Sequence, residues 1–277
     1  MSTDMPLVTF ADADTLSWVT RACLKSAVRC GHPVHLYSYK DVADVPRGVT
    51  VLPAEDVIPY SDFFTFDGIA QPEQFGSTAP FSDVFRYELL KQSRGIWIDW
   101  DVYCLNPLSC EEPMLLGWEG PRSWSNVLNP YRAMAGNAVM WLPAASPILR
   151  ALSDLTTKPY KMPPWLSPIL KRKINKKLDG RPFCPGAARY AEFGPIALNY
   201  FVRKLNMKRH VRHHRYYFPV GYREVDRFLM EDEAFLRSIS PDTKTIHLWH
   251  SAFRYVARDG IPKDSFAERL REESLDA

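Results

Sequence analysis

Two aspartates stand two residues apart directly after the apolar run 96–98, in the order Asp99, Trp100, Asp101. On an extended chain, residues i and i+2 point to the same side, so both carboxylates could reach one ligand. Paired carboxylate oxygens suit a hard cation such as Mg²⁺ or Mn²⁺, which could bind a diphosphate at its open positions and act as a Lewis acid. Because Asp-x-Asp alone is also common in exposed turns, the surrounding residues must show whether this pair is a metal site.

The first hundred residues alternate between predicted strands and helices. Short apolar runs indicate strands, and apolar residues near helical spacing indicate helices. The predicted strands span 7–11, 33–39, 49–52 and 96–98, and the predicted helices span 14–30 and 82–94, the second with Ser82 as N-cap and Gly95 as C-cap. This alternation predicts an α/β fold with a mostly parallel central sheet. In such sheets ligands bind beyond the carboxyl ends of the strands, which is where Asp99 and Asp101 stand.

The second half of the chain continues less regularly. Its predicted elements are a strand at 138–142, helices at 147–155, 195–206 and 227–239, and a late strand at 243–250. The proline-rich segment 158–186 interrupts them and is predicted to be a basic insertion. We expect the whole chain, 1–277, to form a single catalytic domain with this insertion.

The stretch FSDVFRYELLKQSRGIWIDWDVYCLNPL, residues 81–108, resembles the donor-binding block of retaining GT-A glycosyltransferases of family 32. It is similar as well to α-1,4-glycosyltransferases of the globotriaosylceramide synthase type and, more remotely, to the catalytic domain of large clostridial glucosylating toxins. In that block a helix with Ser-Asp-x-x-Arg leads through a glycine into a strand that ends in Asp-x-Asp. The resemblance implies a GT-A fold, a Rossmann-like nucleotide-diphospho-sugar transferase.

The resemblance also implies catalytic and donor-binding roles. Asp83 and Arg86, three residues apart on one helix face, would accept and donate hydrogen bonds to hydroxyls of the donor sugar. The alternative for this pair is a helix-end charge with a surface ion pair. Asp101 would bind the metal directly, and Asp99 would contact the metal and the donor. The predicted catalytic residues are therefore Asp83, Arg86, Asp99 and Asp101.

Weaker similarities extend over the rest of the chain. GNAVMWLPAASPIL resembles the segment beneath the donor sugar, so Asn137 is predicted to contact sugar or acceptor. HLWHSAF resembles a C-terminal His-x-Trp motif, in which His247 would complete the metal site and Trp249 would cover the diphosphate. Imidazole is a suitable ligand beside two carboxylates, above all for Mn²⁺; the alternative is a buried, hydrogen-bonded histidine. Phe10 and Ala11, with Asp12, would bind base and ribose because they end the first strand.

The sequence departs from the family pattern at three places. Arg94 stands where a second glycine is usual, and Phe193 replaces the threonine of a Thr-Gly-Pro segment in FGPIALNYF. The N-terminal VTFADAD replaces the usual Ile-Trp-x-Gly. We expect the reaction to be transfer of a hexose, with retention of configuration, from a nucleotide sugar such as a UDP-sugar to a hydroxyl of a glycan or lipid-linked acceptor. The cofactor would be Mn²⁺ or Mg²⁺.

Charge is unevenly distributed although the net charge is only +3. Residues 158–223 hold sixteen basic residues and two acids, Asp179 and Glu192, which indicates a surface for anions or a solvated basic face. We expect 158–177 to make a peripheral contact with an anionic membrane, with Trp165, Leu166, Ile169 and Leu170 on its apolar side. Nucleic acid is not the expected partner because no nucleic-acid-binding module is recognisable.

The remaining features bear on location and on rival functions. The five cysteines are scattered without a C-x-x-C motif, and the N-terminus lacks a signal-peptide pattern, so we expect a cytoplasmic protein, peripheral at the inner face of the membrane. Two alternatives stay open. One is an aspartate-nucleophile phosphatase that uses Asp99 and Asp101, and the other is a non-catalytic protein that binds sugar nucleotides.

Overall fold

The computed structural model describes residues 5–68, 71–110, 113–120 and 134–275. The chain divides into two compact units. Unit 1 comprises residues 1–53, 95–141 and 211–277, and unit 2 comprises residues 54–94 and 142–210. Each unit contains its own clusters of buried apolar side chains. The single catalytic domain over 1–277 stays a prediction.

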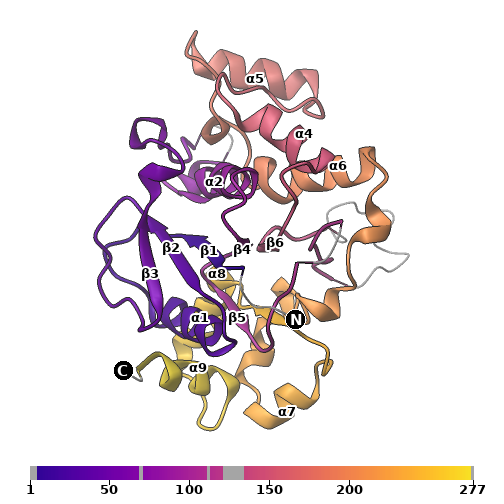
Figure 1. The fold of residues 1–277 in the computed structure, drawn as a ribbon. Coiled ribbons are helices and arrows are strands. Elements are labelled where there is room, and N and C mark those ends of the chain that lie inside the picture. The colour runs from indigo at the N-terminus through magenta and orange to yellow at the C-terminus, as the bar shows by residue number, and fades with distance from the viewer. Residues whose placement is uncertain (1–4, 69–70, 111–112, 121–133, 276–277) are drawn as a thin grey trace. The chain divides into compact units, whose positions relative to one another are not determined.

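A five-stranded sheet with the order β3-β2-β1-β4-β6 forms the centre of unit 1 (Figure 1). Its strands are β1 (Leu7–Phe10), β2 (Val34–Ser38), β3 (Val49–Pro53), β4 (Ile96–Ile98) and β6 (Val139–Met140). β1 pairs in parallel with both β2 and β4, β2 pairs in parallel with β3, and β6 runs antiparallel to β4. The predicted α/β class with a mostly parallel sheet is therefore confirmed.

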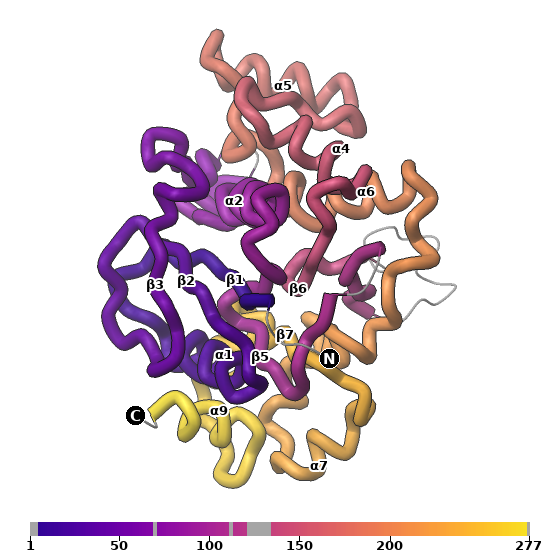
Figure 2. The backbone as a smooth tube through the Cα atoms, viewed as in Figure 1, coloured from indigo at the N-terminus to yellow at the C-terminus, as the bar shows by residue number. Residues whose placement is uncertain are grey.

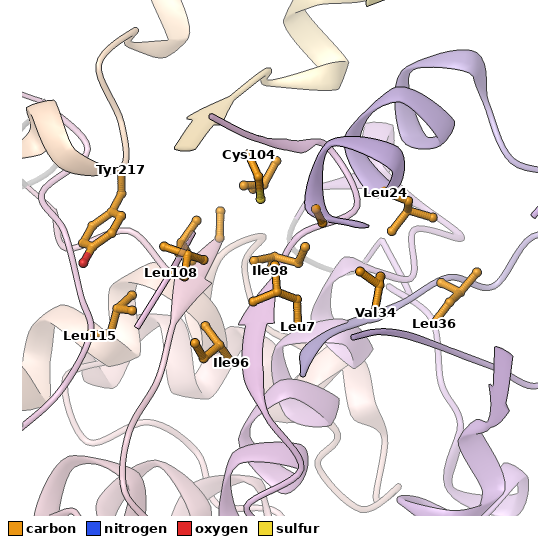
Figure 3. Packing of buried hydrophobic residues seen from close by; sticks show 14 of the residues in the cluster. Leu7, Leu24, Val34, Leu36, Ile96, Ile98, Cys104, Leu108, Leu115 and Tyr217 are labelled. Atoms are coloured by element: carbon orange, nitrogen blue, oxygen red, sulfur yellow. The ribbon is translucent and has the colours of Figure 1, made fainter. Parts of the chain in front are cut away.

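The inner strands are almost wholly buried, since every residue of β1 and β4 and all of β2 except His35 is buried, as expected for parallel strands covered on both faces. Leu7 of β1 stands in register with Val34 of β2 and with Ile96 of β4. All three side chains are buried and belong to one apolar cluster, which Figure 3 shows at close range. Burying a side chain of this size contributes about 1.5–3 kcal/mol to folding. This cluster holds the strand ends that carry the candidate site.

Gly95 permits β4 to pair with β1. A Cβ at this position would lie 2.3 Å from the carbonyl oxygen of Pro6. The N–H of Ile96 donates to that same oxygen at 2.9 Å. Only glycine tolerates such a close approach. The predicted role of Gly95 as a helix C-cap is wrong, because the preceding helix already ends at Lys91 with Gln92 as its C-cap.

A second, two-stranded sheet in unit 1 pairs β5 (Val102–Cys104) with β7 (Thr245–His247) in antiparallel fashion (Figure 2). The helix α1 (Trp18–Arg29) packs against β5 and α9. Ser26 in α1 accepts a hydrogen bond from the N–H of Cys104 at 2.8 Å. The remaining α-helices of unit 1 are α7 (Asp232–Arg237), α8 (His250–Val256) and α9 (Phe266–Leu275).

Unit 2 is mainly helical. Its α-helices are α2 (Ala79–Lys91), α4 (Pro147–Thr156), α5 (Pro168–Leu178) and α6 (Ala197–Lys204). α4 packs against both α2 and α6. α5 belongs to the segment predicted as an insertion, and its residues Ile174 and Leu178 are buried with Leu166 and Ala187. No helix within the described residues is both long enough and apolar enough to cross a membrane.

Three predicted helix boundaries need correction. α2 begins at Ala79 rather than after Ser82, because Pro80 fits the first turn, where its missing N–H costs nothing. In place of the predicted helix 195–206, α6 begins at Ala197 and ends at Lys204, after a kink at Gly194, whose φ of −89° and ψ of −113° are not helical. The predicted helix 227–239 is divided, because the carboxylate of Glu231 caps the new helix α7 by accepting from the N–H of Ala234 at 2.8 Å.

Candidate functional site

Asp99 and Asp101 lie on a tight turn that connects β4 to β5. The N–H of Val102 donates to the carbonyl of Asp99 at 3.0 Å, which closes the turn. The expectation that the pair lies on an extended chain is therefore wrong. The local reason is that β4 and β5 belong to different sheets, so the chain must change direction between them. Asp99 is half-buried and Asp101 is buried.

Antiparallel pairing of β5 with β7 brings His247 to this turn, since Val102 stands opposite His247 in the register. The Nε2 atom of His247 lies 3.2 Å from one carboxylate oxygen of Asp101. The other oxygen of that carboxylate accepts from the N–H of His250 at 2.8 Å. The carbonyl of Asp101 accepts from the N–H of Leu248 at 2.9 Å. Asp101 therefore joins the turn to the residue after β7 through its backbone and to the start of α8 through its side chain.

The three predicted metal ligands form one cluster. Each of Asp99, Asp101 and His247 offers a ligand atom, and these atoms all lie within 4.8 Å of one another. The buried Nδ1 atom of His247 has no hydrogen-bond partner among the described residues. A buried polar atom without a partner is costly, and such atoms concentrate at functional sites. Two carboxylates and one imidazole suit Mn²⁺ or Mg²⁺, so the residues present fit a divalent cation.

The electrostatics of the cluster follow from its burial and its charges. Burial alone would raise the pKa of Asp101, but His247 and the N–H of His250 outweigh it and lower that pKa to about 2. Burial alone would lower the pKa of His247, but the carboxylates of Asp101, Asp99 and Glu119 outweigh it and raise that pKa. Asp101 is therefore ionised over the whole neutral range, as a metal ligand must be.

Asp99 is held in place from two sides. One carboxylate oxygen of Asp99 accepts from the indole N–H of Trp97 at 2.6 Å. The backbone N–H of Asp99 donates to the carbonyl of Ala138 at 2.7 Å, which continues the pairing of β4 with β6. Asn137, the predicted sugar-contacting residue, is buried and directly precedes Ala138, whose carbonyl accepts from Asp99.

The ring of Trp249 contacts that of the predicted metal ligand His247, with ring centroids 4.0 Å apart and the planes tilted by 41°. Its indole N–H donates to the carbonyl of Val220 at 2.9 Å. The backbone of Trp249 has φ 53°, a left-handed conformation that is uncommon for a large side chain. Strain of this kind is frequent at functional sites, where surrounding contacts hold it. The half-buried indole is thus fixed next to the cluster.

The predicted base-binding residues lie at the carboxyl end of β1, the parallel neighbour of β4. Phe10 and Ala11 are both buried, and the N–H of Ala11 donates to the carbonyl of Tyr37 at 3.0 Å. The ring of Phe10 packs edge-on against Tyr39 with centroids 5.9 Å apart. Asp12 is half-buried and lies 3.6 Å from the ammonium of Lys40. Because β1 and β4 are parallel, these residues and Asp99 share one edge of the sheet.

Asp83 and Arg86 form a second polar pair, within unit 2. Both are buried in α2, and the guanidinium of Arg86 lies 3.3 Å from the carboxylate of Asp83. A surface ion pair, the alternative for these residues, is therefore excluded by their burial. Arg86 also donates to the hydroxyl of Ser82 at 3.2 Å. A Cβ at Gly194 would lie 2.5 Å from both carboxylate oxygens of Asp83, so glycine at 194 leaves room for this carboxylate.

Glu119 is a candidate residue that the sequence patterns did not identify. It is partly buried and lies where an isolated bridge pairs Trp118 with Ala135. Burial, with a smaller contribution from Asp99, raises its pKa to about 7, although His247 opposes this rise. The signal in the sequence is a lone acid after the apolar run 114–118, a pattern too common to indicate a site without the tertiary structure.

The basic segment is more integrated than its composition indicates. Leu166 is buried, Trp165 is half-buried against Tyr200, and only Ile169 among the four expected apolar contact residues is exposed. The exposed side of α5 carries instead its charges, namely Arg172, Lys173, Lys176 and Lys177. The predicted apolar side therefore faces the protein core for the most part, because these side chains cover the small cluster around Ile174.

Comparison with known proteins adds little to the geometry. No protein-family model matches the chain, and no curated protein matches it. One solved chain, described as a transferase mutant, is similar over 70% of this chain and 90% of its own length, with 14% sequence identity and a TM-score of 0.35. A likeness at that TM-score does not establish a shared fold.

All five cysteines are free thiols, in agreement with their scattered spacing.

Proposed function

We propose that the protein is a metal-dependent glycosyltransferase of the GT-A type, similar to family 32, that uses a nucleotide-diphosphate sugar. The observation that supports this proposal best is the cluster of Asp99, Asp101 and His247 at the carboxyl end of β4, with the unpartnered Nδ1 atom of His247. Ligand sites of α/β sheets lie at this edge. The sequence block 81–108 adds the resemblance in residue order.

Asp99, Asp101 and His247 would hold the cation, for which we propose Mn²⁺ or Mg²⁺. When bound, such a cation would neutralise negative charge on the diphosphate of the donor. Asp101 is suited to this role because it is ionised at neutral pH and is fixed by the backbone of α8. The indole of Trp249, which contacts the His247 ring, would exclude water from the diphosphate.

The donor-binding roles follow from the resemblance and from side-chain chemistry. Asp83 would accept hydrogen bonds from sugar hydroxyls, and Arg86 would donate them. Phe10 and Ala11 would contact the base at the end of β1, and Asn137 would contact the sugar or the acceptor. We propose a uridine nucleotide as the donor. Because the pair in α2 is buried, its orientation is restricted, which favours recognition of one sugar configuration.

The proposed reaction forms a bond between an acceptor oxygen and the anomeric carbon of the donor sugar. The bond from that carbon to the diphosphate oxygen breaks, and the acceptor proton passes to the departing diphosphate. The products are a glycoside with retained configuration and a nucleoside diphosphate. The same-face route is proposed because no carboxylate has been placed as a nucleophile on the opposite face. The acceptor would be a glycan or a lipid-linked hydroxyl, with α5 held electrostatically at an anionic membrane surface.

The proposal is tested first by metal binding and then by turnover. Titration of the purified protein with Mn²⁺, followed by electron paramagnetic resonance, should show one tight site in the wild type. Asp101→Asn should weaken that site at least tenfold, whereas Asp259→Asn, at an exposed carboxylate elsewhere in unit 1, should leave it unchanged.

A panel of nucleotide sugars with Mn²⁺ then measures donor hydrolysis and transfer. We expect one donor class to be turned over by the wild type and not by Asp101→Asn. Wild-type Mn²⁺ affinity in Asp101→Asn would refute the assignment of the ligands. Hydrolysis of phosphate monoesters without turnover of any nucleotide sugar would favour the aspartate-nucleophile phosphatase instead.

A further inference from the structure

A cavity of about 290 Å³ lies within unit 1, close to the candidate metal cluster but with different walls. The lining residue Phe218 is buried, and the polar side chains that line the cavity carry both signs of charge. These polar side chains are Glu119, His214, Arg215, Glu224, Arg227, Ser238 and Ser240. Ligand cavities usually measure about 300–1,000 Å³, so this one is of a size for a single small ring rather than a whole oligomer.

One segment joins the cavity to the cluster. The edge of the Phe218 ring faces His247, with ring centroids 6.1 Å apart. The carbonyl of Tyr217 accepts from the hydroxyl of Thr245 in β7 at 3.0 Å. The carbonyl of Val220 accepts from the indole of Trp249. Residues 217–220 therefore contact His247, β7 and Trp249, and two of them, Phe218 and Pro219, also line the cavity.

The second connection is Glu119, which lines the cavity and interacts electrostatically with His247 and Asp99. Among the described residues, the Glu119 carboxylate has no hydrogen-bond or ion-pair partner, although its backbone N–H donates to the carbonyl of Met134. Because the side chain is only partly buried, its carboxylate can exchange water for a hydroxyl donor of a ligand. Glu119 thus offers an acceptor to any ligand that enters the cavity.

The chemistry of the walls selects the ligand class. Arg227 donates to the hydroxyl of Ser238 at 2.9 Å, and Glu224 accepts from the N–H of Gly221 at 2.9 Å. Arg215 also lines the cavity, so two arginines and two glutamates face this small space and their formal charges balance. A sugar hydroxyl can donate to a carboxylate and also accept from a guanidinium. The mixed lining therefore favours a neutral polyhydroxyl ring.

We propose that this cavity binds one neutral sugar residue of the acceptor. Glu119 accepts hydrogen bonds from the hydroxyls of that sugar, and the positive charge of Arg227 balances the negative charge of the carboxylate. The inference rests on the proposed glycosyltransferase function, because it places one sugar residue of the acceptor beside the proposed transfer site. According to this inference, the part of the acceptor that enters the cavity is a saccharide and not a phosphate group. Glu119 is a binding residue in this proposal.

Saturation-transfer NMR of the full chain with a panel of methyl glycosides, in the absence of donor, tests the inference. The panel contains the α- and β-methyl glycosides of glucose, galactose, mannose and their N-acetylamino forms, with inorganic phosphate and UMP as further probes. We expect at least one glycoside to bind the wild type and to bind Glu119→Gln at least tenfold more weakly. Glu272→Gln, at an exposed glutamate, should bind like the wild type.

Two further variants separate this inference from the proposed function. Ser240→Phe should fill the cavity and abolish glycoside binding without removing a charge. Asp101→Asn should lose transfer but retain glycoside binding, because Asp101 does not line the cavity. Glycoside binding that depends on Glu119 would uphold the cavity assignment even if no nucleotide sugar were turned over. The inference is overturned if no glycoside binds, if Glu119→Gln and Ser240→Phe bind normally, or if phosphate or UMP competes for the cavity.

Discussion

Replacing Asp101 with asparagine measures how much the charge of this carboxylate stabilises unit 1 without a metal. Asparagine keeps an oxygen that can accept from the N–H of His250, but it removes the negative charge beside His247. His247 and the His250 N–H lower the pKa of Asp101 from 3.8 to about 2 against the opposing effect of burial. That difference corresponds to about 2 kcal/mol of stabilisation in the ionised state.

The sign of the pH dependence follows from the direction of the pKa change. The folded protein binds the proton of Asp101 more weakly than the unfolded chain does, so ionisation favours folding. The stabilisation is fully present above the unfolded pKa of 3.8 and is lost as the pH falls through about 2. We therefore expect Asp101→Asn to be about 2 kcal/mol less stable than the wild type at neutral pH, and about half of that difference to remain near pH 3.

The assay is urea unfolding in metal-free buffer, combined with hydrogen exchange of β5 and β7, where the loss should be concentrated. Asp99→Asn is the matched control, because Asp99 is half-buried and accepts a neutral hydrogen bond from Trp97. We expect Asp99→Asn to cost about 1 kcal/mol or less. Wild-type stability of Asp101→Asn at neutral pH, or a difference that does not shrink in acid, would refute the reasoning.

Three further predictions concern backbone space and surface charge. Gly95→Ala should destabilise unit 1 by about 3 kcal/mol in urea unfolding, because its Cβ would lie 2.3 Å from the carbonyl oxygen of Pro6. The control Gly180→Ala, which has open space at φ +79°, should cost only about 1 kcal/mol. Equal costs for the two variants would contradict this prediction. Gly194→Ala should raise the KM for the donor at least tenfold and also lower the melting temperature, because its Cβ would displace the buried Asp83 carboxylate from Arg86; an unchanged KM would count against a donor role. The basic side of α5 is neutralised by replacing five residues with glutamine, namely Lys171, Arg172, Lys173, Lys176 and Lys177. This variant should no longer co-sediment with anionic vesicles. Unchanged vesicle binding would exclude the membrane contact.

Much of the framework could be predicted from the sequence, because its signals are local. The apolar runs that became β1, β2, β3 and β4 are short and bounded by turn residues, and their alternation with helices indicates a parallel sheet. The helix starts were less accurate. Ser82 has the chemistry of an N-cap, yet Pro80 allows α2 to begin earlier, and Glu231 divides a predicted continuous helix. Such boundaries depend on competing local contacts that residue types alone do not rank.

In the candidate site too, residue types could be predicted from the sequence, whereas their spatial arrangement could not. Asp99 and Asp101 could be selected from their spacing, and His247 from its motif, but their meeting depends on the antiparallel pairing of β5 with β7. That pairing joins residues far apart in the chain. The expected extended geometry was wrong because the pair connects two different sheets and must turn.

Residue identity by itself determined which groups could bind a metal, accept from hydroxyls or carry positive charge. The tertiary structure decided which of these groups are buried and which lack a partner. Glu119 illustrates the difference, since a lone glutamate becomes a candidate binding group only where folding removes it from water and places it beside a cavity. Leu166 illustrates the converse, since an apolar residue expected at a membrane is buried in the protein. The physical reason is that burial depends on long-range packing, which local sequence patterns do not encode.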